Sequence, residues 1–442
     1  MSAATIEETH RDLQQTWGLN FGHIRTLIYK LDTWHTQADL VDAIGLSHRG
    51  VGQVLRQLEP WLEKDDQRLR LSPQHLDSFR TAFKPQNPST DPYDTAAHQH
   101  PALDPLTQIL AARPTPDYHL DHVAATPATL IKRALYIETT YDLTDAHILC
   151  LGDHDLTSLA LANILPAVPI AVVDVDDRLL AFIDETARKN TWNITTYFAD
   201  FRLELPQSLA TCFDLVFTDP PYSPDGVKLF LQRGIAALKD HPFARLLLAY
   251  GFGEQHPGLG YKVQTTLHEL RLTSEAILPH FNHYHGARAI GAQSALYTLR
   301  PTRRSLPAAT RIANTTNIYT HGRSAEEAQT TPPLADAQTM AQDWQATETL
   351  LVGDSWPKET WSQAKRLSLT AYLETCRTDA PPRTQNLALQ LYPHFDPYLP
   401  RLLLTAQAQS LLAVVDRAHS TLFDDAPLRS LLECKYRLVD RT

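Results

Sequence analysis

Residues 121–322 predict an α/β fold built on a doubly wound, mainly parallel sheet. Short apolar runs in this region alternate with amphipathic segments. Apolar runs at that spacing are typical of strands that are covered by helices on both faces of a sheet. Two strand-like runs then follow each other closely, at 274–290 and 293–300, as expected of an antiparallel hairpin at the sheet edge.

The elements of this sheet can be assigned in order. Five apolar runs are expected to form strands, at 147–152, 169–176, 195–200, 213–222 and 244–251. Amphipathic segments at 156–165 and 178–190 are expected to form helices between them. An antiparallel ending of this kind is typical of Rossmann-like sheets of the methyltransferase type, which is the fold class we predict.

Residues 1–83 predict an N-terminal winged-helix domain. A helical stretch at 21–31 is followed by two more that are broken at 44–47, and a short hairpin is expected at 64–73. DNA binding would use the segment that starts near Ser47, with Arg49 and Arg56 available. The basic residues form no stripe, however, and acids are frequent. We therefore expect the domain to support dimerisation or to cover an active site.

Two further segments complete the predicted organisation. Residues 84–120 are rich in proline, aspartate and small residues, which favours a linker or an extended arm on a neighbouring domain. Residues 323–442 predict a C-terminal α/β extension, a small βαβαβ unit with helices ahead of it. The sequence does not indicate what this extension does.

Composition narrows the class of protein. The chain has 442 residues and a formal net charge of −10, which disfavours a nucleic-acid clamp, because phosphate binding requires basic surface. The four cysteines are scattered without a CxxC pair, as in a reduced cytoplasmic protein. No signal-peptide pattern or membrane-length apolar run is evident. We expect a cytoplasmic homo-oligomer, a dimer, that binds neither membrane nor nucleic acid.

Acidic residues follow every predicted parallel strand. Ligands of open α/β sheets bind at the carboxyl ends of the strands, so these acids are expected to form one crevice. The residues concerned are Asp153 and Asp155 beside Gly152, then Asp174, Asp200 and Asp219, with Glu254 shortly after the fifth strand. One aspartate alone is an ordinary turn or capping residue. Their joint placement favours a binding site.

Three of these acids are assigned to a nucleoside and an amine. Asp174 lies about twenty residues after Gly152, where an acid accepts hydrogen bonds from ribose hydroxyls. Asp200 occupies the position that commonly meets an adenine amino group. The motif Asp219-Pro220-Pro221-Tyr222 combines a carboxylate with a rigid backbone and an aromatic ring. We expect it to orient an amino nitrogen that attacks a sulfonium carbon.

The first loop reads Gly152-Asp153-His154-Asp155, where a glycine-rich turn is more usual. Aspartates at this point would repel the carboxylate of S-adenosylmethionine. Decarboxylated S-adenosylmethionine ends instead in an ammonium group, which acids attract. The sequence therefore favours aminopropyl transfer from the decarboxylated donor, with a polyamine as the acceptor.

Several motifs in order resemble those of the branched-chain polyamine synthases, the bis(aminopropyl)spermidine synthases. They are GDHDLTS, TDPPYS, GFGE, LGYKVQ, FNHYHGARAIGAQSALY and IYTHG, within residues 1–322. The resemblance implies aminopropyl transfer to an internal nitrogen of spermidine. It also implies that Asp155 helps to deprotonate the amine, and that Asn282 and Tyr284 line the substrate site. We further expect Glu254 to hold a distal ammonium group.

The chain departs from the family pattern at three places. His154 stands where the family usually has aspartate, Ser223 stands where it has threonine, and the extension beyond about residue 325 is additional. No metal is expected, because among His280, His283 and His285 only the last two share one face of a strand.

Three alternatives remain open. A DNA amino-methyltransferase would need a basic recognition region and a glycine-rich first loop. An enzyme that transfers an aminobutanoyl or methyl group from intact S-adenosylmethionine would need a cation for the carboxylate, for which Arg202 and Lys228 are the candidates. A polyamine-sensing regulator would bind polyamine in the crevice without turnover.

Overall fold

The computed structural model describes most of the chain up to residue 320 and parts of the remainder. The described ranges are 5–84, 91–117, 120–203, 205–240, 243–311, 318–320, 345–353, 356, 361, 363–367, 369, 372, 382–390, 399–414 and 426–437. Contacts divide the protein into two units. The first comprises 1–199 and 205–312, and the second comprises 200–204 and 313–442.

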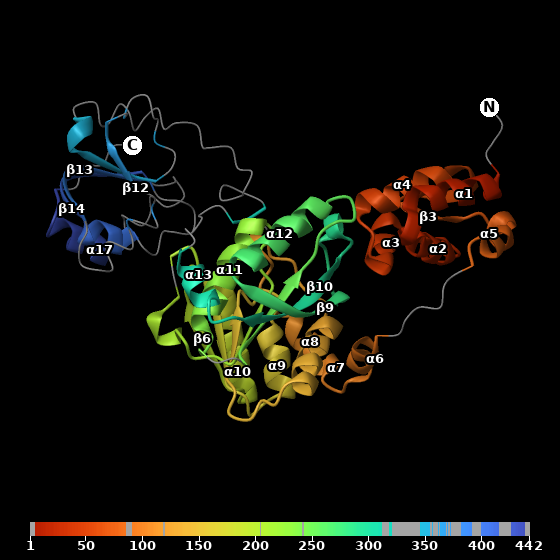
Figure 1. The fold of residues 1–442 in the computed structure, drawn as a ribbon, viewed down its shortest axis with the longest axis horizontal. Coiled ribbons are helices and arrows are strands. Elements are labelled where there is room, and N and C mark those ends of the chain that lie inside the picture. The colour runs from red at the N-terminus through yellow and green to blue at the C-terminus, as the bar shows by residue number, and fades with distance from the viewer. Residues whose placement is uncertain are drawn as a thin grey trace. The chain divides into compact units, whose positions relative to one another are not determined.

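The first unit begins with a small helical region that carries a three-stranded sheet (Figure 1). Its elements are α1 (Ile6–Trp17), α2 (Phe21–Lys30), β1 (His35–Thr36), α3 (Gln37–Ile44), α4 (His48–Leu58), β2 (Leu62–Asp65), β3 (Arg68–Leu71) and α5 (Leu76–Ala82). The strand order is β1-β3-β2, and both pairings are antiparallel. The predicted helices and hairpin are therefore present, with a turn between α3 and α4 at Gly45, where φ is +75°.

The main sheet has seven strands in the order β6-β5-β4-β7-β8-β10-β9. The strands are β4 (Ile148–Leu151), β5 (Ile170–Asp174), β6 (Ile194–Phe198), β7 (Leu215–Thr218), β8 (Arg245–Tyr250), β9 (Leu272–His283) and β10 (Gln293–Pro301). The first five are parallel, whereas β10 is antiparallel to both β8 and β9. The predicted doubly wound sheet with an antiparallel edge hairpin is confirmed.

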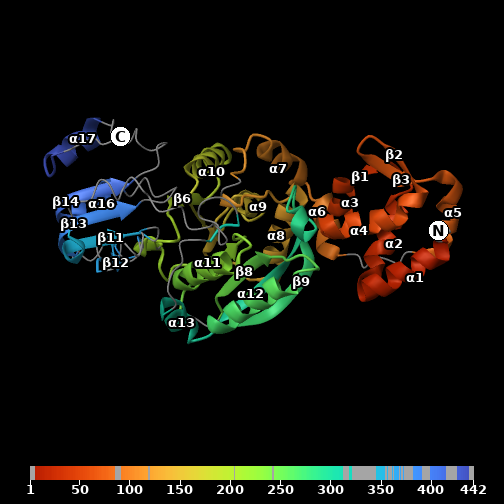
Figure 2. The ribbon, with the colours of Figure 1, turned by 90° about the horizontal axis from the view of Figure 1, so that it is seen from above.

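Helices cover both faces of this sheet (Figure 2). On one side lie α8 (Pro127–Thr140), α9 (Thr157–Ile164) and α10 (Asp177–Asn190), and on the other lie α11 (Pro224–Ala237), α12 (Pro257–Glu269) and α13 (Ser305–Arg311). The chain runs outward from β4 to β6 and then returns to β7 on the other side of β4. The carboxyl ends of β4 and β7 therefore meet where the strand order reverses, which is where such sheets bind ligands.

The prediction of a linker or extended arm over residues 84–120 is wrong in part. Two helices form there, α6 (Pro92–Gln99) and α7 (Leu103–Leu110). The Tyr93 ring packs against Tyr136 of α8, with 5.6 Å between the ring centroids. Asp91 caps α6 by accepting the Tyr93 N–H, and Pro92 occupies the first turn. Proline and aspartate are common at helix starts, which explains why this composition was misleading.

The second unit contains a parallel sheet in the order β12-β11-β13-β14. Its elements are β11 (Thr349–Val352), β12 (Lys365–Leu367), β13 (Arg383–Gln390), α16 (Leu399–Thr405), β14 (Gln407–Val414) and α17 (Ala426–Glu433). The predicted succession of β13, α16, β14 and α17 is present. Helices were predicted ahead of this succession, but strands β11 and β12 form there, so the prediction is wrong at these two places. The last predicted strand falls largely outside the described residues.

Within the described part of the chain, every helix is too short or too polar to cross a membrane.

Gly152 directly follows β4 and lies in the left-handed region, with φ at +68°. A Cβ atom at this position would lie 2.7 Å from Cε1 of Phe230 on α11. We expect Gly152→Ala to lower the free energy of unfolding by about 1–3 kcal/mol, because it adds both strain and a clash. Urea denaturation measures this loss.

Gly258→Ala is the matched control for that change. Gly258 lies in the first turn of α12, and nothing lies within 4 Å of the position of an added Cβ. Alanine there should be neutral or stabilising by up to about 1 kcal/mol. An equal loss of stability in both variants would contradict the role assigned to Gly152.

Candidate active site

The loops after β4, β5 and β7 meet at the strand-order reversal. The Asp153 N–H donates to Oδ2 of Asp174 across 2.9 Å, which ties the first loop to the end of β5. The Thr218 hydroxyl donates to the Leu151 carbonyl at 2.8 Å, which ties the end of β7 to the end of β4. These bonds bring the predicted residues Asp153, Asp174 and Asp219 to one place.

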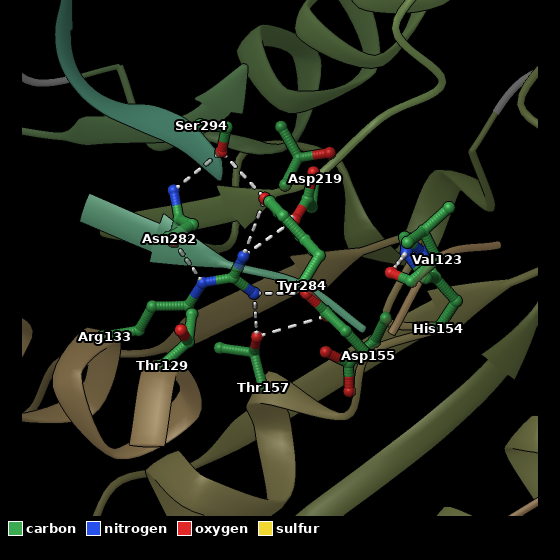
Figure 3. Close-up of polar contacts among 12 residues, drawn as sticks. Val123, Thr129, Arg133, His154, Asp155, Thr157, Asp219, Asn282, Tyr284 and Ser294 are labelled. Atoms are coloured by element: carbon green, nitrogen blue, oxygen red, sulfur yellow. Dashed lines mark hydrogen bonds and ion pairs between the residues drawn. The ribbon is translucent and has the colours of Figure 1, made fainter. Parts of the chain in front are cut away.

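The centre of this place is a buried guanidinium group, that of Arg133 on α8 (Figure 3). Arg133 forms ion pairs with Asp155 and, across 2.7 Å, with Oδ2 of Asp219. Its carbon Cζ also lies 4.7 Å from the centroid of the Phe217 ring. The acids after β4 and β7 are therefore held by one cation that comes from a third element.

Every N–H of Arg133 has an acceptor. Nε donates to Oδ1 of Asn282 at 2.8 Å, Nη1 donates to Asp155 and to the Thr157 hydroxyl, and Nη2 donates to Asp219 and to the Tyr284 hydroxyl. A guanidinium group has five N–H donors, so this set uses all of them. In this arrangement Arg133 has none left for a ligand carboxylate.

The two carboxyl groups on Arg133 differ in proton affinity. Burial raises the pKa of Asp155, but the Arg133 charge, His154 and the hydrogen bonds to this carboxyl together outweigh burial and hold that pKa below its ordinary value. Burial raises the pKa of Asp219 above its ordinary value despite Arg133, and the Asp155 charge acts in the same direction. Two carboxyl groups that share one site commonly separate in this way. Asp219 is therefore the member that accepts a proton more readily.

Two tyrosines and two polar residues complete the surroundings of Asp219. Tyr284 donates its hydroxyl proton to Asp219 across 2.8 Å and lies 2.9 Å from the Tyr222 hydroxyl. The hydroxyls of Tyr284 and Ser294 are 2.8 Å apart, and the Asn282 amide donates to Ser294 at 3.0 Å. Burial raises the pKa of both tyrosines well above the usual range, so they remain neutral.

Asp153 and Asp174 have mainly backbone partners. The Asp153 carboxylate accepts the Ser158 N–H in the first turn of α9, and burial raises the pKa of this carboxyl well above its ordinary value. The Asp174 carboxylate accepts the N–H groups of Asp153, Val175 and Asp176. These bonds fix the two loops on which a nucleoside is predicted to rest.

His154 lies beside the acidic loop in a stacked pair of imidazoles. Its ring centroid is 4.9 Å from that of His122, and the two planes differ by 6°. Its Nε2 donates to the Val123 carbonyl across 3.1 Å. Burial and the neighbouring His154 lower the pKa of His122 to about 3, so His122 is neutral at physiological pH. His154 thus joins the loop to the segment ahead of α8.

Four other residues named from the sequence have partners within the protein. Arg202 pairs with Asp200, with 2.6 Å between Nη2 and Oδ2, and contacts assign both residues to the second unit. Glu254 accepts hydrogen bonds from Ser47. Lys228, the other candidate for a ligand carboxylate, faces Glu269 at 3.7 Å.

The sequence reasoning missed Arg133. The signal was a charged residue within the otherwise apolar face formed by Leu130, Ala134 and Ile137 of one helix. A buried charge in such a place requires a partner of opposite sign. As for the histidines, the described residues contain no group of three or more His, Cys, Asp or Glu that could hold a metal ion.

Arg133→Met should be strongly destabilising. It leaves two buried carboxyl groups without their cation, and breaking a buried pair in this way costs about 3–5 kcal/mol. Chemical denaturation measures the loss.

Arg188→Met provides the control, because Arg188 pairs with Asp184 on the exposed face of α10, where an ion pair contributes little. A loss for Arg133→Met as small as that for Arg188→Met would contradict the central role of this guanidinium group.

Two proteins of known sequence resemble part of this chain. An uncharacterised protein of Methanocaldococcus jannaschii, MJ0675, is 36% identical over 208 residues, which are 47% of this chain and 51% of that protein. The N(4)-bis(aminopropyl)spermidine synthase of the same organism is 37% identical over 186 residues, 41% of this chain and 52% of that enzyme. The chain thus matches about half the length of these relatives.

A solved structure has the same fold. It is the C9 mutein of the branched-chain polyamine synthase from Thermus thermophilus, in complex with N4-aminopropylspermidine and 5'-methylthioadenosine. It superposes with a TM-score of 0.50 at 20% identity and covers 72% of this chain and 95% of that one.

The family profile described as "Branched-chain polyamine synthase A C-terminal domain" matches residues 102–331, more than half of the chain. This match includes the acidic loop, the DPPY motif and the edge hairpin. The resemblance drawn from the motifs is confirmed, and the chain belongs to the branched-chain polyamine synthase family.

Proposed function

We propose that the protein is an aminopropyltransferase. It moves the aminopropyl group of decarboxylated S-adenosylmethionine to an amine nitrogen of a polyamine such as spermidine and releases methylthioadenosine. The observation that carries this proposal is the state of Arg133, the cation at the centre of the site, whose five N–H groups all have acceptors within the protein. Two carboxyl groups pair with it, from Asp155 and Asp219. Those of Asp153 and Asp174 lie in the loops after β4 and β5, which a hydrogen bond joins.

The chemistry of these groups fits the decarboxylated donor. A carboxylated methionine arm would meet aspartates without an available guanidinium group, and like charges in a poorly solvated site repel strongly. A terminal ammonium group would find acceptors instead. We assign the donor's nucleoside to Gly152, Asp153 and Asp174, with Asp174 on the ribose hydroxyls.

The acceptor is assigned to the DPPY side. Asp219, Tyr222 and the two prolines 220 and 221 would orient the attacking nitrogen, while Asn282 and Tyr284 line its site through their bonds to Arg133, Ser294 and Asp219. The curated relative named N(4)-bis(aminopropyl)spermidine synthase supports a spermidine-like acceptor for this chain.

The reaction is a direct displacement. The amine lone pair forms a bond to the methylene carbon beside the sulfonium, and the carbon–sulfur bond breaks with its electron pair moving to sulfur. The amine proton passes to the carboxyl pair. The raised pKa of Asp219 makes it the better acceptor, whereas Arg133 keeps Asp155 ionised. Holding the two substrates in line contributes much of the rate, on the order of 7–11 kcal/mol in favourable cases.

Other readings remain as alternatives. Transfer of an aminobutanoyl or methyl group from intact S-adenosylmethionine would require Arg133 to exchange one of its partners for the carboxylate. A regulator that senses polyamine would bind in the same place without turnover. We also retain three proposals from the sequence: the N-terminal region is a winged-helix domain, the protein is a cytoplasmic dimer, and it uses no metal.

Incubation with each sulfonium donor and a panel of polyamines tests the function. Mass spectrometry should detect a gain of one or two aminopropyl units with the decarboxylated donor only. Asp219→Asn should lower turnover by about 10²-fold or more, because it removes a proton acceptor and an orienting carboxylate. Asp184→Asn, an exposed change on α10, is the control and should leave turnover intact. Equal turnover with the carboxylated donor would refute the charge argument.

The acidic limb of the pH–rate profile tests the proton assignment. The Asp155 charge contributes to the raised pKa of Asp219, so Asp155→Asn should lower the pKa of Asp219. Asp219 then stays ionised, and able to accept a proton, down to lower pH. We expect the acidic limb of the residual kcat/KM to move to lower pH than in the wild type. A limb that stays in place or moves upward would exclude Asp219 as the base.

A further inference from the structure

The first turn of α4 is capped by a carboxylate from far along the chain. Ser47, the N-cap residue, accepts the Gly50 N–H at its Oγ across 3.1 Å. The same hydroxyl donates to Oε1 of Glu254 at 2.5 Å, and the Ser47 N–H donates to Oε2 at 3.2 Å. Ser47 is 6% exposed. A carboxylate is favoured there, because the N-terminus of a helix carries partial positive charge.

Close backbone contacts surround this pair. A Cβ atom on Gly291 would lie 2.4 Å from the Gly45 carbonyl oxygen, and one on Gly45 would lie 2.3 Å from Oε1 of Gln293. Both glycines have positive φ, +75° at Gly45 and +78° at Gly291. Arg288 adds an ion pair with Asp42 at 3.1 Å. The turn between α3 and α4 is thus packed against residues 288–293, the segment that includes η6 (Arg288–Ile290).

The same segment leads into the candidate active site. A Cβ atom on Gly251 would lie 2.9 Å from the Gln293 carbonyl oxygen and 3.0 Å from Cβ of Ser294. Ser294 is the residue that contacts both Tyr284 and Asn282 beside Asp219 and Arg133. The loop 251–254 therefore contacts Ser47 at its Glu254 end and Ser294, beside the proposed amine site, at its Gly251 end.

We propose that Ser47 is a positioning residue for the acceptor, so that the N-terminal region is part of the acceptor site. Its two hydrogen bonds hold Glu254 and fix the loop 251–254 along Ser294. Glu254 is then held in one position, in which its carboxylate can receive a distal ammonium group of a polyamine. The identity of the substrate in this inference rests on the proposed function. The contact between Ser47 and Glu254 is independent of that function.

Ser47→Ala tests the proposal, with Thr36→Ala as the matched control. Thr36 caps α3 in the same region, accepting the Asp39 N–H at 3.1 Å within a capping box, so its loss removes a comparable cap at a site without Glu254. Ser47→Ala should raise the KM for spermidine on the order of tenfold, as expected for losing a hydrogen bond to a charged group, with a smaller change in kcat. Ser47→Thr should restore the wild-type KM.

Hydrogen exchange separates this proposal from the proposed function. Amides of residues 251–260 should exchange faster in Ser47→Ala and in Glu254→Gln than in the wild type or Thr36→Ala, whatever reaction the protein catalyses. Unchanged exchange together with an unchanged KM in Ser47→Ala would overturn the positioning role. If the wild type transfers no aminopropyl group but the variants show the expected faster exchange, the proposed function is refuted and the positioning contact is established.

Discussion

The ion pairs of Arg133 with Asp155 and Asp219 organise the whole site. The three residues come from α8, from the loop after β4 and from the loop after β7, elements that the strand order brings together. A buried charge is costly without partners, so each of the three holds the other two in place. Breaking these ion pairs would therefore affect both the stability of the fold and the geometry of the candidate active site.

The groups around Arg133, Asp155 and Asp219 determine which ligand charge the site favours. All five N–H groups of Arg133 have acceptors, and the nearby tyrosines stay neutral because burial raises their pKa. Asp155 adds negative charge, because its pKa is lowered, whereas the carboxyl groups of Asp153 and Asp174, whose pKa values burial raises, add hydrogen-bond acceptors. An arrangement of this kind favours cationic ligands, which is the physical basis for choosing a decarboxylated donor and a polyamine over carboxylated substrates.

The N-terminal region holds Glu254, which we propose as part of the acceptor site, through two hydrogen bonds from Ser47. A helix-turn-helix that binds DNA uses the start of its second helix in the major groove. In this protein the corresponding turn packs on the segment 288–293, and Ser47 is bonded to Glu254. The region therefore has a role within the chain that its sequence pattern alone would not reveal, because the pattern is the same for both uses.

Local pattern was enough to predict the sheet, its antiparallel edge and the acids at the strand ends, because strand periodicity and the position after each strand are properties of neighbouring residues. It was also enough to recognise the family from the loop at 152–158 and the DPPY motif. Helices α6 and α7 were missed, since proline and aspartate mark helix starts as well as linkers. Arg133 and the bond between Ser47 and Glu254 could not be read from the sequence. They join residues far apart in the chain, and only the packing of the folded protein decides which buried charge meets which partner.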